Sequence, residues 1–372
     1  MDSPTNPPGN EPFQYPSTQP TPQPESVIMA QPVPIAPQVV IHQHTGGWQR
    51  FISWVGWVGL MICIPIIIGM AAAFEDYFNT SGGVREKYHS LSKNADNKIA
   101  LIELTGIISE GDGFVKKQIE RVREDDDVKG IIVRVDSPGG TVSGSDYIYH
   151  HLCQLKNEKE VPLVVSMGSM CASGGYYISM AVEDQAQSIY AEPTTTTGSI
   201  GVIIPHYDLS GLLARYSIED DSIVSHPRKQ MLSMTRKASE EDRVVLQSYV
   251  DQSFERFKGI VRDGRPKFKE DPEALDKLAT GEIFTAEQAK ENGLVDEIGF
   301  IEDAVDRVLE LTGLNEDDVR VVRYEQPPNL LDSLSSARVS SSTGIETALL
   351  ELATPKAYYI TTTLPALFES RP

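Results

Sequence analysis

The chain has 372 residues, 40% of them hydrophobic, which is enough for one large folded domain with appendages. Its 53 acidic residues outnumber 33 basic ones, and the resulting net charge of -20 argues against nucleic acid as a partner, because phosphate binding needs a basic face. Three cysteines (Cys63, Cys153 and Cys171) are too few for a disulfide framework, and the absence of CxxC, HExxH or clustered His/Cys motifs leaves a bound metal or cofactor without support.

Residues 1–50 have the composition of a disordered tail. Eleven of the 24 prolines lie between Pro4 and Pro37, interleaved with Gln, Ser, Thr and Asn. Such a segment buries too little apolar area to offset the chain entropy that folding would remove. We therefore predict a tail or linker here.

Residues 51–74 read FISWVGWVGLMICIPIIIGMAAAF and carry no charge. As a helix rising about 1.5 Å per residue, they reach about 36 Å, enough to cross a hydrocarbon layer about 30 Å thick. Trp48, Trp54 and Trp57 gather at one end, as tryptophans do at a membrane interface. This pattern predicts a transmembrane helix rather than the buried helix of a soluble core.

The flanks of this helix bear on its processing and orientation. Fifty residues precede it, and they are not basic, which disfavours a cleavable signal peptide. Arg50 is the only Lys or Arg before the helix, whereas Arg85, Lys87 and Lys93 follow it. The distribution of positive charge therefore gives no support to a cytoplasmic N-terminus.

From Lys98 onward, strand and helix patterns alternate after a connector at 75–97. This rhythm predicts an α/β core with strands covered by helices. We expect strands at 99–108, 131–136, 161–168 and 187–190, helices at 112–124, 141–155, after Ala172, at 240–261 and within 273–312, and a last strand at AYYITTT in the loop-rich tail.

Two glycine-rich turns follow consecutive buried strands. The first is DSPGGTV (136–142), where glycines allow positive φ and close approach of the backbone, so that N–H groups can hold an oxyanion. The same residues are also common in ordinary turns that have no catalytic role. The second is GSMCASGGYYIS (168–179), in which Ser173 stands between a strand and a helix, before Gly174 and Gly175.

Ser173 is the candidate nucleophile because acyl transfer needs a hydroxyl and an oxyanion donor about 3 Å from one carbonyl. The motif is not GxSxG, which disfavours an α/β-hydrolase. Alternatively, Ser173 serves as a helix N-cap. The competing serines 166, 169 and 179 do not precede a Gly-Gly pair.

These stretches resemble the short form of signal peptide peptidase A, the Ser/Lys serine peptidases of the ClpP/crotonase-like superfamily. The matching segments are RVDSPGG (134–140), GSMCASGGYYIS (168–179), TGSIGVI (197–203), SHPRK from Ser225 and GEIFTAEQAKENGLVDEIG (281–299). The resemblance implies a core of repeated strand-strand-helix units, a peptidase domain at 98–313 and a C-terminal extension at 314–372, behind the transmembrane helix.

The resemblance also implies roles for individual residues. Ser173 is then the nucleophile and Lys229 the general base. The two glycine-rich turns on consecutive strands themselves suggest that the N–H groups of Gly174 and of Gly140, or its neighbour Gly139, form the oxyanion hole. Asp136 stands where the family more often has Asn, and His226 where it more often has Gly. The second departure weakens the choice of Lys229 over Arg228 or Lys237.

A lysine acts as a base only when neutral, which requires desolvation. Val224, Met231, Leu232 and Met234 supply apolar neighbours along the sequence. A solvated surface lysine is the plainer interpretation of Lys229 from the sequence alone. His150, His151 and His206 are rival bases for a Ser-His-Asp triad, although structural roles suit them better.

The resemblance implies a single-pass protein of the cell membrane whose catalytic domain lies outside the cytoplasm. It would cleave apolar peptides, including remnant signal peptides, and would assemble as a homo-oligomer with residues 51–74 in the lipid bilayer. Two alternatives remain: a crotonase-like acyl-CoA enzyme, and an inactive homologue that acts as an envelope scaffold.

Overall fold

The computed structural model describes residues 47–78, 83–326 and 358–360, so the predicted tail at 1–46 lies outside the described residues. The described chain divides within its first helix, into a unit that ends at Ile66 and a unit that begins at Ile67. Helix α1 (Gly47–Phe78) contains the predicted transmembrane segment and includes Pro65. Its span Arg50–Ala71 has a mean hydropathy of 2.3 and no buried residue, so by length and composition it is able to cross a membrane.

The second unit is built on a nine-stranded sheet. Along the sheet the strand order is β1 (Arg85–Leu91), β10 (Val319–Glu325), β2 (Asn97–Thr105), β3 (Val128–Ser137), β5 (Leu163–Ala172), β6 (Ile189–Ala191) and β9 (Glu297–Ile298), while β7 (Thr196–Gly198) pairs with β5 and with β8 (Ile283–Thr285). The pairs from β10 to β9 are parallel, and β1 and β8 are antiparallel to their neighbours. This parallel-dominated sheet confirms the predicted α/β class.

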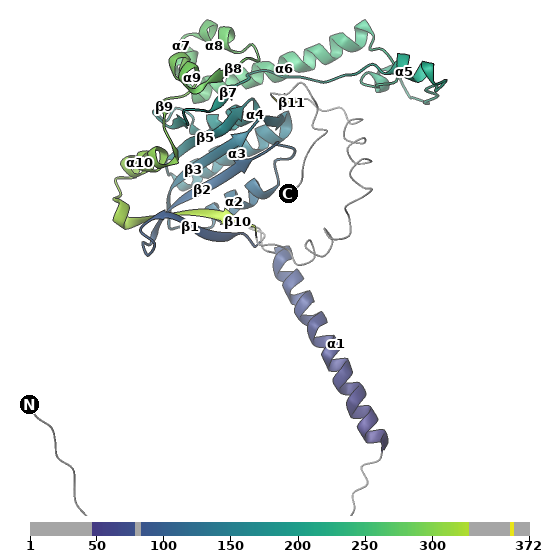
Figure 1. Cartoon of the computed structure of the whole chain (residues 1–372), viewed down its shortest axis with the longest axis vertical. Coiled ribbons are helices and arrows are strands. Elements are labelled where there is room, and N and C mark those ends of the chain that lie inside the picture. The colour runs from purple at the N-terminus through teal and green to yellow at the C-terminus, as the bar shows by residue number, and fades with distance from the viewer. Residues whose placement is uncertain (1–46, 79–82, 327–357, 361–372) are drawn as a thin grey trace, which may run out of the picture. The chain divides into compact units, whose positions relative to one another are not determined.

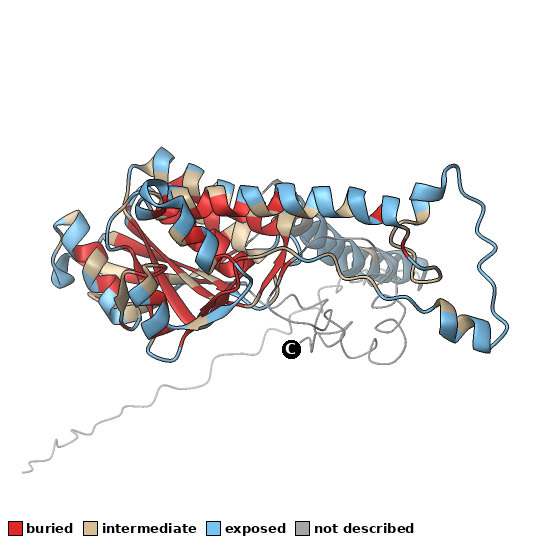
Figure 2. Cartoon of the chain, turned by 90° about the horizontal axis from the view of Figure 1, so that it is seen from above, coloured by how far each residue is buried: buried red, intermediate tan, exposed pale blue. Residues whose placement is uncertain are grey.

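Helices cover both faces of the sheet (Figures 1 and 2). They are α2 (Phe114–Arg123), α3 (Val142–Lys159), α4 (Gly174–Ser179), α6 (Glu240–Gly264), α7 (Lys267–Glu270), α8 (Pro272–Leu278), α9 (Ala286–Asn292) and α10 (Ile301–Thr312), with short 3₁₀ turns at Met180–Val182 and Glu316–Asp318.

Alternate strand residues fill two cores, as the period of two requires. Ile99 and Leu101 of β2 pack with Val308 of α10, whereas Ala100 and Ile102 face the larger core with α2, α3, α4 and α6. Because both faces are covered, the central strands are almost continuously apolar.

The sheet includes two strands from outside residues 98–313. Strand β1 lies in the connector predicted at 75–97, and β10 lies in the C-terminal extension, parallel to β2. The expected strand at AYYITTT appears as β11 (Tyr358–Ile360), which pairs with β4 (Gly139–Thr141) in a separate two-stranded sheet.

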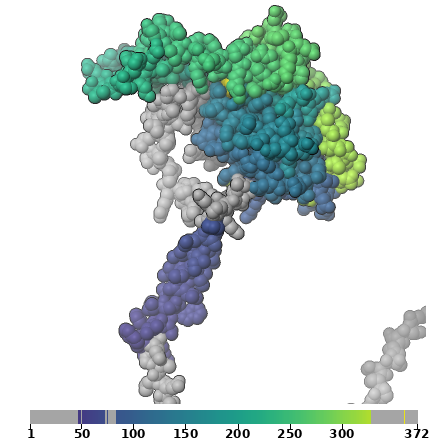
Figure 3. Space-filling view, turned by 180° about the vertical axis from the view of Figure 1, so that it is seen from behind, coloured from purple at the N-terminus to yellow at the C-terminus, as the bar shows by residue number. Residues whose placement is uncertain are grey.

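Residues 202–239, called the arm here, leave the sheet after β7 and return to it through α6 (Figure 1). The arm carries α5 (Ser210–Arg215) and a 3₁₀ turn at Pro227–Gln230. Its two limbs are joined by the hydrogen bond from Leu209 N to Met234 O, 2.8 Å long. In Figure 3 the arm projects from the rest of the second unit.

Candidate active site

Ser173 connects the end of β5 to the start of α4 in a backbone conformation that few residues adopt. Its φ is 55° and its ψ is -113°, outside the helical, extended and left-handed helical regions. The main chain is held on both sides, because Ser173 N donates to Gly198 O and Ser173 O accepts from Tyr177 N, each at 2.8 Å. Strained backbone of this kind persists only where its surroundings enforce it, as at active sites.

The side chain of Ser173 is buried and unpaired. The residue is 1% exposed, and its Oγ has no hydrogen-bond partner among the described residues. It occupies the N-cap position of α4 but makes no capping hydrogen bond. A buried hydroxyl without a partner is unusual, and here it removes the capping interpretation of this serine.

The hydroxyl groups of the three other candidate nucleophiles all form hydrogen bonds. Ser166 Oγ accepts from Arg134, Ser169 Oγ donates to Asp136 Oδ1 at 2.8 Å, and Ser179 Oγ donates to Gly175 O at 2.9 Å. Burial raises the pKa of the neighbouring Cys171 thiol to about 12, so this cysteine stays protonated and is a poor nucleophile at neutral pH.

The two glycine-rich turns meet at Ser173 because β3 and β5 are adjacent. A Cβ built on Gly174 would lie 3.2 Å from Gly140 N, so the N–H groups of these glycines are close together. Gly174 begins α4, and the first N–H groups of a helix have no acceptor within it. Gly139 N, in contrast, donates to Ser137 Oγ at 3.1 Å, and its φ of 99° makes the turn.

Asp136 ties the two turns together. Its Oδ1 accepts from Ser169 Oγ at 2.8 Å and from Met170 N at 3.0 Å. The carboxylate at this position thus anchors the segment that leads into Ser173.

Lys229 lies in the arm, away from Ser173. It is exposed, and its N–H donates to His226 O at 2.9 Å in the 3₁₀ turn. Helix α6 reaches the main core at Phe257 but begins at Glu240, and 17 residues at about 1.5 Å each place that start about 25 Å farther out. Arg228 and Lys237 belong to the same arm. Within one chain, none of these three side chains is hydrogen-bonded to Ser173.

The three histidines considered as bases contact groups other than Ser173. His150 lines a surface cavity with Cys153 and Gln154. His151 Nδ1 lies 3.3 Å from Lys116 Nζ, and burial together with this cation lowers the pKa of His151. His206 Nε2 is 3.1 Å from Ser233 O. None of the three is hydrogen-bonded to Ser173 Oγ, so the described residues form no Ser-His pair there.

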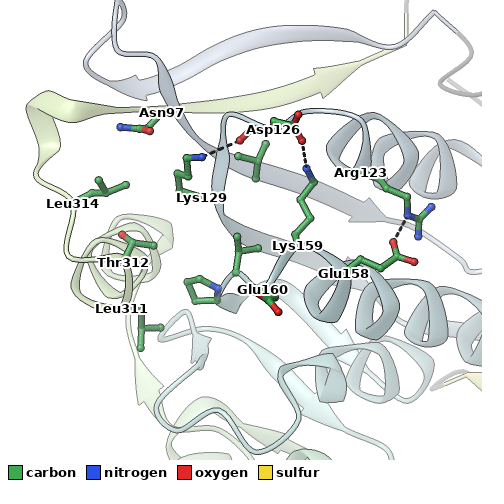
Figure 4. Close-up of a pocket in the computed structure, with 13 residues that line it drawn as sticks. Asn97, Arg123, Asp126, Lys129, Glu158, Lys159, Glu160, Leu311, Thr312 and Leu314 are labelled. Atoms are coloured by element: carbon green, nitrogen blue, oxygen red, sulfur yellow. Dashed lines mark hydrogen bonds and ion pairs between the residues drawn. The ribbon is translucent and has the colours of Figure 1, made fainter.

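A cavity of about 710 Å³ lies elsewhere, between the starts of β2, β3 and β5 (Figure 4). Four of its charged side chains form ion pairs, Arg123 with Glu158 and Lys159 with Asp126. Ligands of open parallel sheets bind beyond the carboxyl ends of the strands, where Ser173 stands, and this cavity is at the opposite ends.

The pairing of β11 with β4 beside Ser173 did not follow from the sequence. The strand pattern at AYYITTT was visible, but strand periodicity carries no signal for a partner more than 200 residues away. Tyr359 thereby enters the site together with Tyr177 and Phe257.

Comparisons with known proteins identify relatives of this chain. The model of peptidase family S49 matches residues 155–315. "Putative signal peptide peptidase SppA" of Enterococcus faecium is 36% identical over 63% of this chain and 70% of its own length. "Protease 4" of Salmonella typhi is 36% identical over 68% of this chain and 41% of its own length, and "Serine protease SPPA, chloroplastic" of Arabidopsis thaliana is 28% identical over 74% and 41%.

These matches, together with the parallel-dominated sheet, confirm the ClpP/crotonase-like class and the predicted serine peptidase. The chain belongs to peptidase family S49.

Proposed function

We propose that this chain is a membrane-anchored endopeptidase in which Ser173 is the nucleophile and Lys229 the general base. The observation that carries the proposal is Ser173 itself, with a buried, unpartnered Oγ on a strained turn. A hydroxyl that satisfies no structural hydrogen bond is free to attack a carbonyl once a base accepts its proton.

The oxyanion hole is formed by the N–H groups of Gly174 and Gly140. Their proximity supports this role, since both can donate to one oxygen next to Ser173. Gly139 N is engaged by Ser137, so Gly139 contributes through its positive φ, which allows the turn.

Lys229 serves the Ser173 of a second copy of the chain, in a homo-oligomer. Two observations support this pairing: Lys229 is on the distal arm, and no base among the described residues is hydrogen-bonded to Ser173 Oγ. The arm also exposes large apolar side chains suited to burial against another copy, namely Ile203, Tyr207, Leu209, Leu212, Tyr216, Ile218, Ile223 and Val224. Burial in such an interface would desolvate Lys229 and favour its neutral form.

The substrates are apolar peptides, among them signal peptides left in the membrane after precursor cleavage. The printed name of the Enterococcus faecium relative supports this class. An anchor formed by α1 would hold the enzyme at the bilayer where such peptides reside.

The domain after α1 faces away from the cytoplasm. Lys and Arg around α1 do not favour this orientation, so it needs a direct test. Protease added outside spheroplasts should digest the chain beyond Phe78 and spare the N-terminal tail, whereas digestion of the tail alone would reverse the orientation.

A serine-reactive phosphonate tests the function itself. It should label the wild-type chain at Ser173, leave Ser173→Ala unlabelled, and abolish peptide cleavage in step with labelling. Cleavage retained in Ser173→Ala would refute the nucleophile. Acyl-CoA turnover without phosphonate labelling would favour the crotonase-like alternative, and the absence of both activities would favour a scaffold.

A further inference from the structure

Ser145 lies behind the two glycines that form the proposed oxyanion hole. It stands near the start of α3, four residues after the N-cap Thr141, and it is fully buried. Its Oγ is 2.4 Å from the point where a Cβ of Gly174 would be, so the hydroxyl packs against the Cα of that glycine. Gly140 N lies 3.2 Å from the same point. The hydroxyl of Ser145 and both glycines therefore meet at one place.

A hydrogen bond fixes the direction of the Ser145 side chain. Its Oγ donates to Thr141 O at 2.9 Å, within the same helix. A buried hydroxyl held in this way keeps one rotamer, because any other rotamer would lose the bond and find no water to replace it. The oxygen is thereby kept against Gly174, at the start of α4.

The position of Gly140 is fixed by Ile108. Ile108 N donates to Gly139 O at 2.9 Å, and Thr141 N donates to Ile108 O at 2.7 Å. Both chain neighbours of Gly140 are thus bonded to the main chain of one residue. Thr141 joins this fixed segment to Ser145, since its own carbonyl accepts the Ser145 hydroxyl.

The position of Gly174 depends on packing. Gly174 begins α4, and the first N–H groups of a helix have no acceptor within it. Among the described residues other than its chain neighbours, the atom nearest to its missing Cβ is Ser145 Oγ, ahead of Gly139 Cα at 3.2 Å. The distance between Gly174 and Gly140 is therefore set by an atom of Ser145.

We propose that Ser145 is a positioning residue of the oxyanion hole, whose hydroxyl sets the separation between the N–H groups of Gly174 and Gly140. This inference rests on the proposed function of Ser173 and the two glycines. Oxyanion donors act at about 2.7–3.1 Å from the developing charge, so a small displacement weakens them. Alanine at position 145 would leave a gap the size of an oxygen atom beside Gly174.

Ser145→Ala in the full chain is the first test. It should lower kcat by roughly tenfold or more and leave KM within about twofold, because a misplaced donor costs interaction energy only in the transition state. A higher KM with unchanged kcat would refute the positioning role.

Ser179→Ala is the matched control for stability. Ser179 is also fully buried, and its Oγ donates to the carbonyl four residues earlier, Gly175 O, at 2.9 Å. Both variants lose one buried hydrogen bond, so their melting temperatures should fall alike. Only Ser145→Ala should lower kcat. An equal loss of kcat in the two variants would mean that Ser145 acts through stability alone, and would overturn the proposal.

Gly174→Ala tests the contact itself. Its Cβ would collide with Ser145 Oγ, so this variant should be nearly inactive. Adding Ser145→Ala removes the colliding oxygen and leaves the next atoms 3.2 Å away. Ser145→Ala should therefore raise kcat by about tenfold in the Gly174→Ala background, opposite to its effect in wild type, because residues in contact are not additive. An equal or lower kcat in the double variant would contradict the contact.

A peptide aldehyde reports on the oxyanion hole without turnover. Ser173 Oγ adds to the aldehyde carbon, its proton passes to the base, and the carbonyl oxygen becomes an oxyanion held by the two N–H groups. The aldehyde Ki should rise in Ser145→Ala by the factor by which kcat/KM falls. The Ki of the matching peptide alcohol, which forms no adduct, should stay unchanged. Equal increases of both Ki values would place Ser145 in peptide binding and refute the inference.

Titration with the serine-reactive phosphonate separates this inference from the function beneath it. The reagent should label the same fraction of chains in wild type and Ser145→Ala, and kcat is expressed per labelled chain. A wild-type kcat and aldehyde Ki in Ser145→Ala would remove the positioning role and keep the nucleophile. Cleavage retained in Ser173→Ala would remove the proposed function itself.

Discussion

The glycines around Ser173 pack too closely against neighbouring atoms to accept a side chain. A Cβ on Gly140 would lie 1.9 Å from Ile108 O, a clash with main chain that β4 must move to relieve. The lack of space for a Cβ therefore limits which residue types can replace the glycines of this site.

Gly140→Ala should lower turnover by roughly 100- to 1000-fold, the usual cost of losing one oxyanion donor. The measurement is kcat on an apolar peptide, alongside circular dichroism to confirm folding. Gly113→Ala is the control, because its Cβ would meet nothing within 4 Å and its φ is -71°. A fully active Gly140→Ala would exclude Gly140 from the oxyanion hole.

Replacement of Lys229 tests the identity of the base. Activity should require an amine at position 229, since a neutral amine can accept the Ser173 proton. Lys229→Arg should be inactive, because guanidinium stays protonated at any workable pH. A wild-type limb near pH 6.5 that disappears on replacing His150, His151 or His206 would instead identify a histidine base.

At the scale of elements, a buried ionic cluster joins β1, β2 and the loop before β3. Lys98 Nζ bonds Asp125 Oδ2 at 2.6 Å and Glu86 Oε2 at 3.1 Å, and Arg121 also bonds Glu86. Lys98 and Asp125 are nearly fully buried, so removing one partner leaves an uncompensated charge.

Lys98→Met should therefore lower the free energy of unfolding by about 3–5 kcal/mol, as measured by urea denaturation. Lys129→Met, on the neighbouring strand β3, is the control, because Lys129 is exposed and its amine donates to the backbone carbonyl of Asp126. An equal effect of the two changes would contradict the cluster's contribution.

The same cluster predicts how stability depends on pH. Burial by itself would raise the pKa of Asp125, but its hydrogen bonds with Lys98 and Asp127 N outweigh burial and lower it. The contribution of Asp125 is thus present above its unfolded pKa of about 3.9 and is lost as pH falls through the lower folded value. Urea midpoints at pH 3 and pH 7 should differ less in Asp125→Asn than in wild type.

At the scale of the whole molecule, the arm carries Lys229 far from the Ser173 of its own chain. Inactive Ser173→Ala and Lys229→Ala chains, co-expressed and purified together, should regain about a quarter of wild-type activity, because random pairing across a repeated interface joins an intact Ser173 with an intact Lys229 that often. Each variant alone, treated identically, is the control. No recovery in a verified mixed oligomer would mean that the two residues pair within one chain.

The sequence by itself determined the local features of this protein. Uncharged residues at 51–74 predict a membrane-length helix, and near-continuous apolar runs predict the central strands, because length and periodicity express burial directly. The Ser-Gly-Gly motif predicted Ser173 as the nucleophile, since a nucleophile between strand and helix needs small neighbours whose backbone can approach it.

Only the tertiary structure decided what lies near Ser173. Contact across the sheet joins Gly140 to Gly174, and the pairing of β4 with β11 brings Tyr359 across more than 200 residues of chain. The arm likewise separates Lys229 from the serine of its own chain, a serine with which only the family resemblance had paired it. Long-range contacts depend on which strand edges and helix faces remain free after the core has packed. The periodicity of one segment does not specify which distant segment will pair with it.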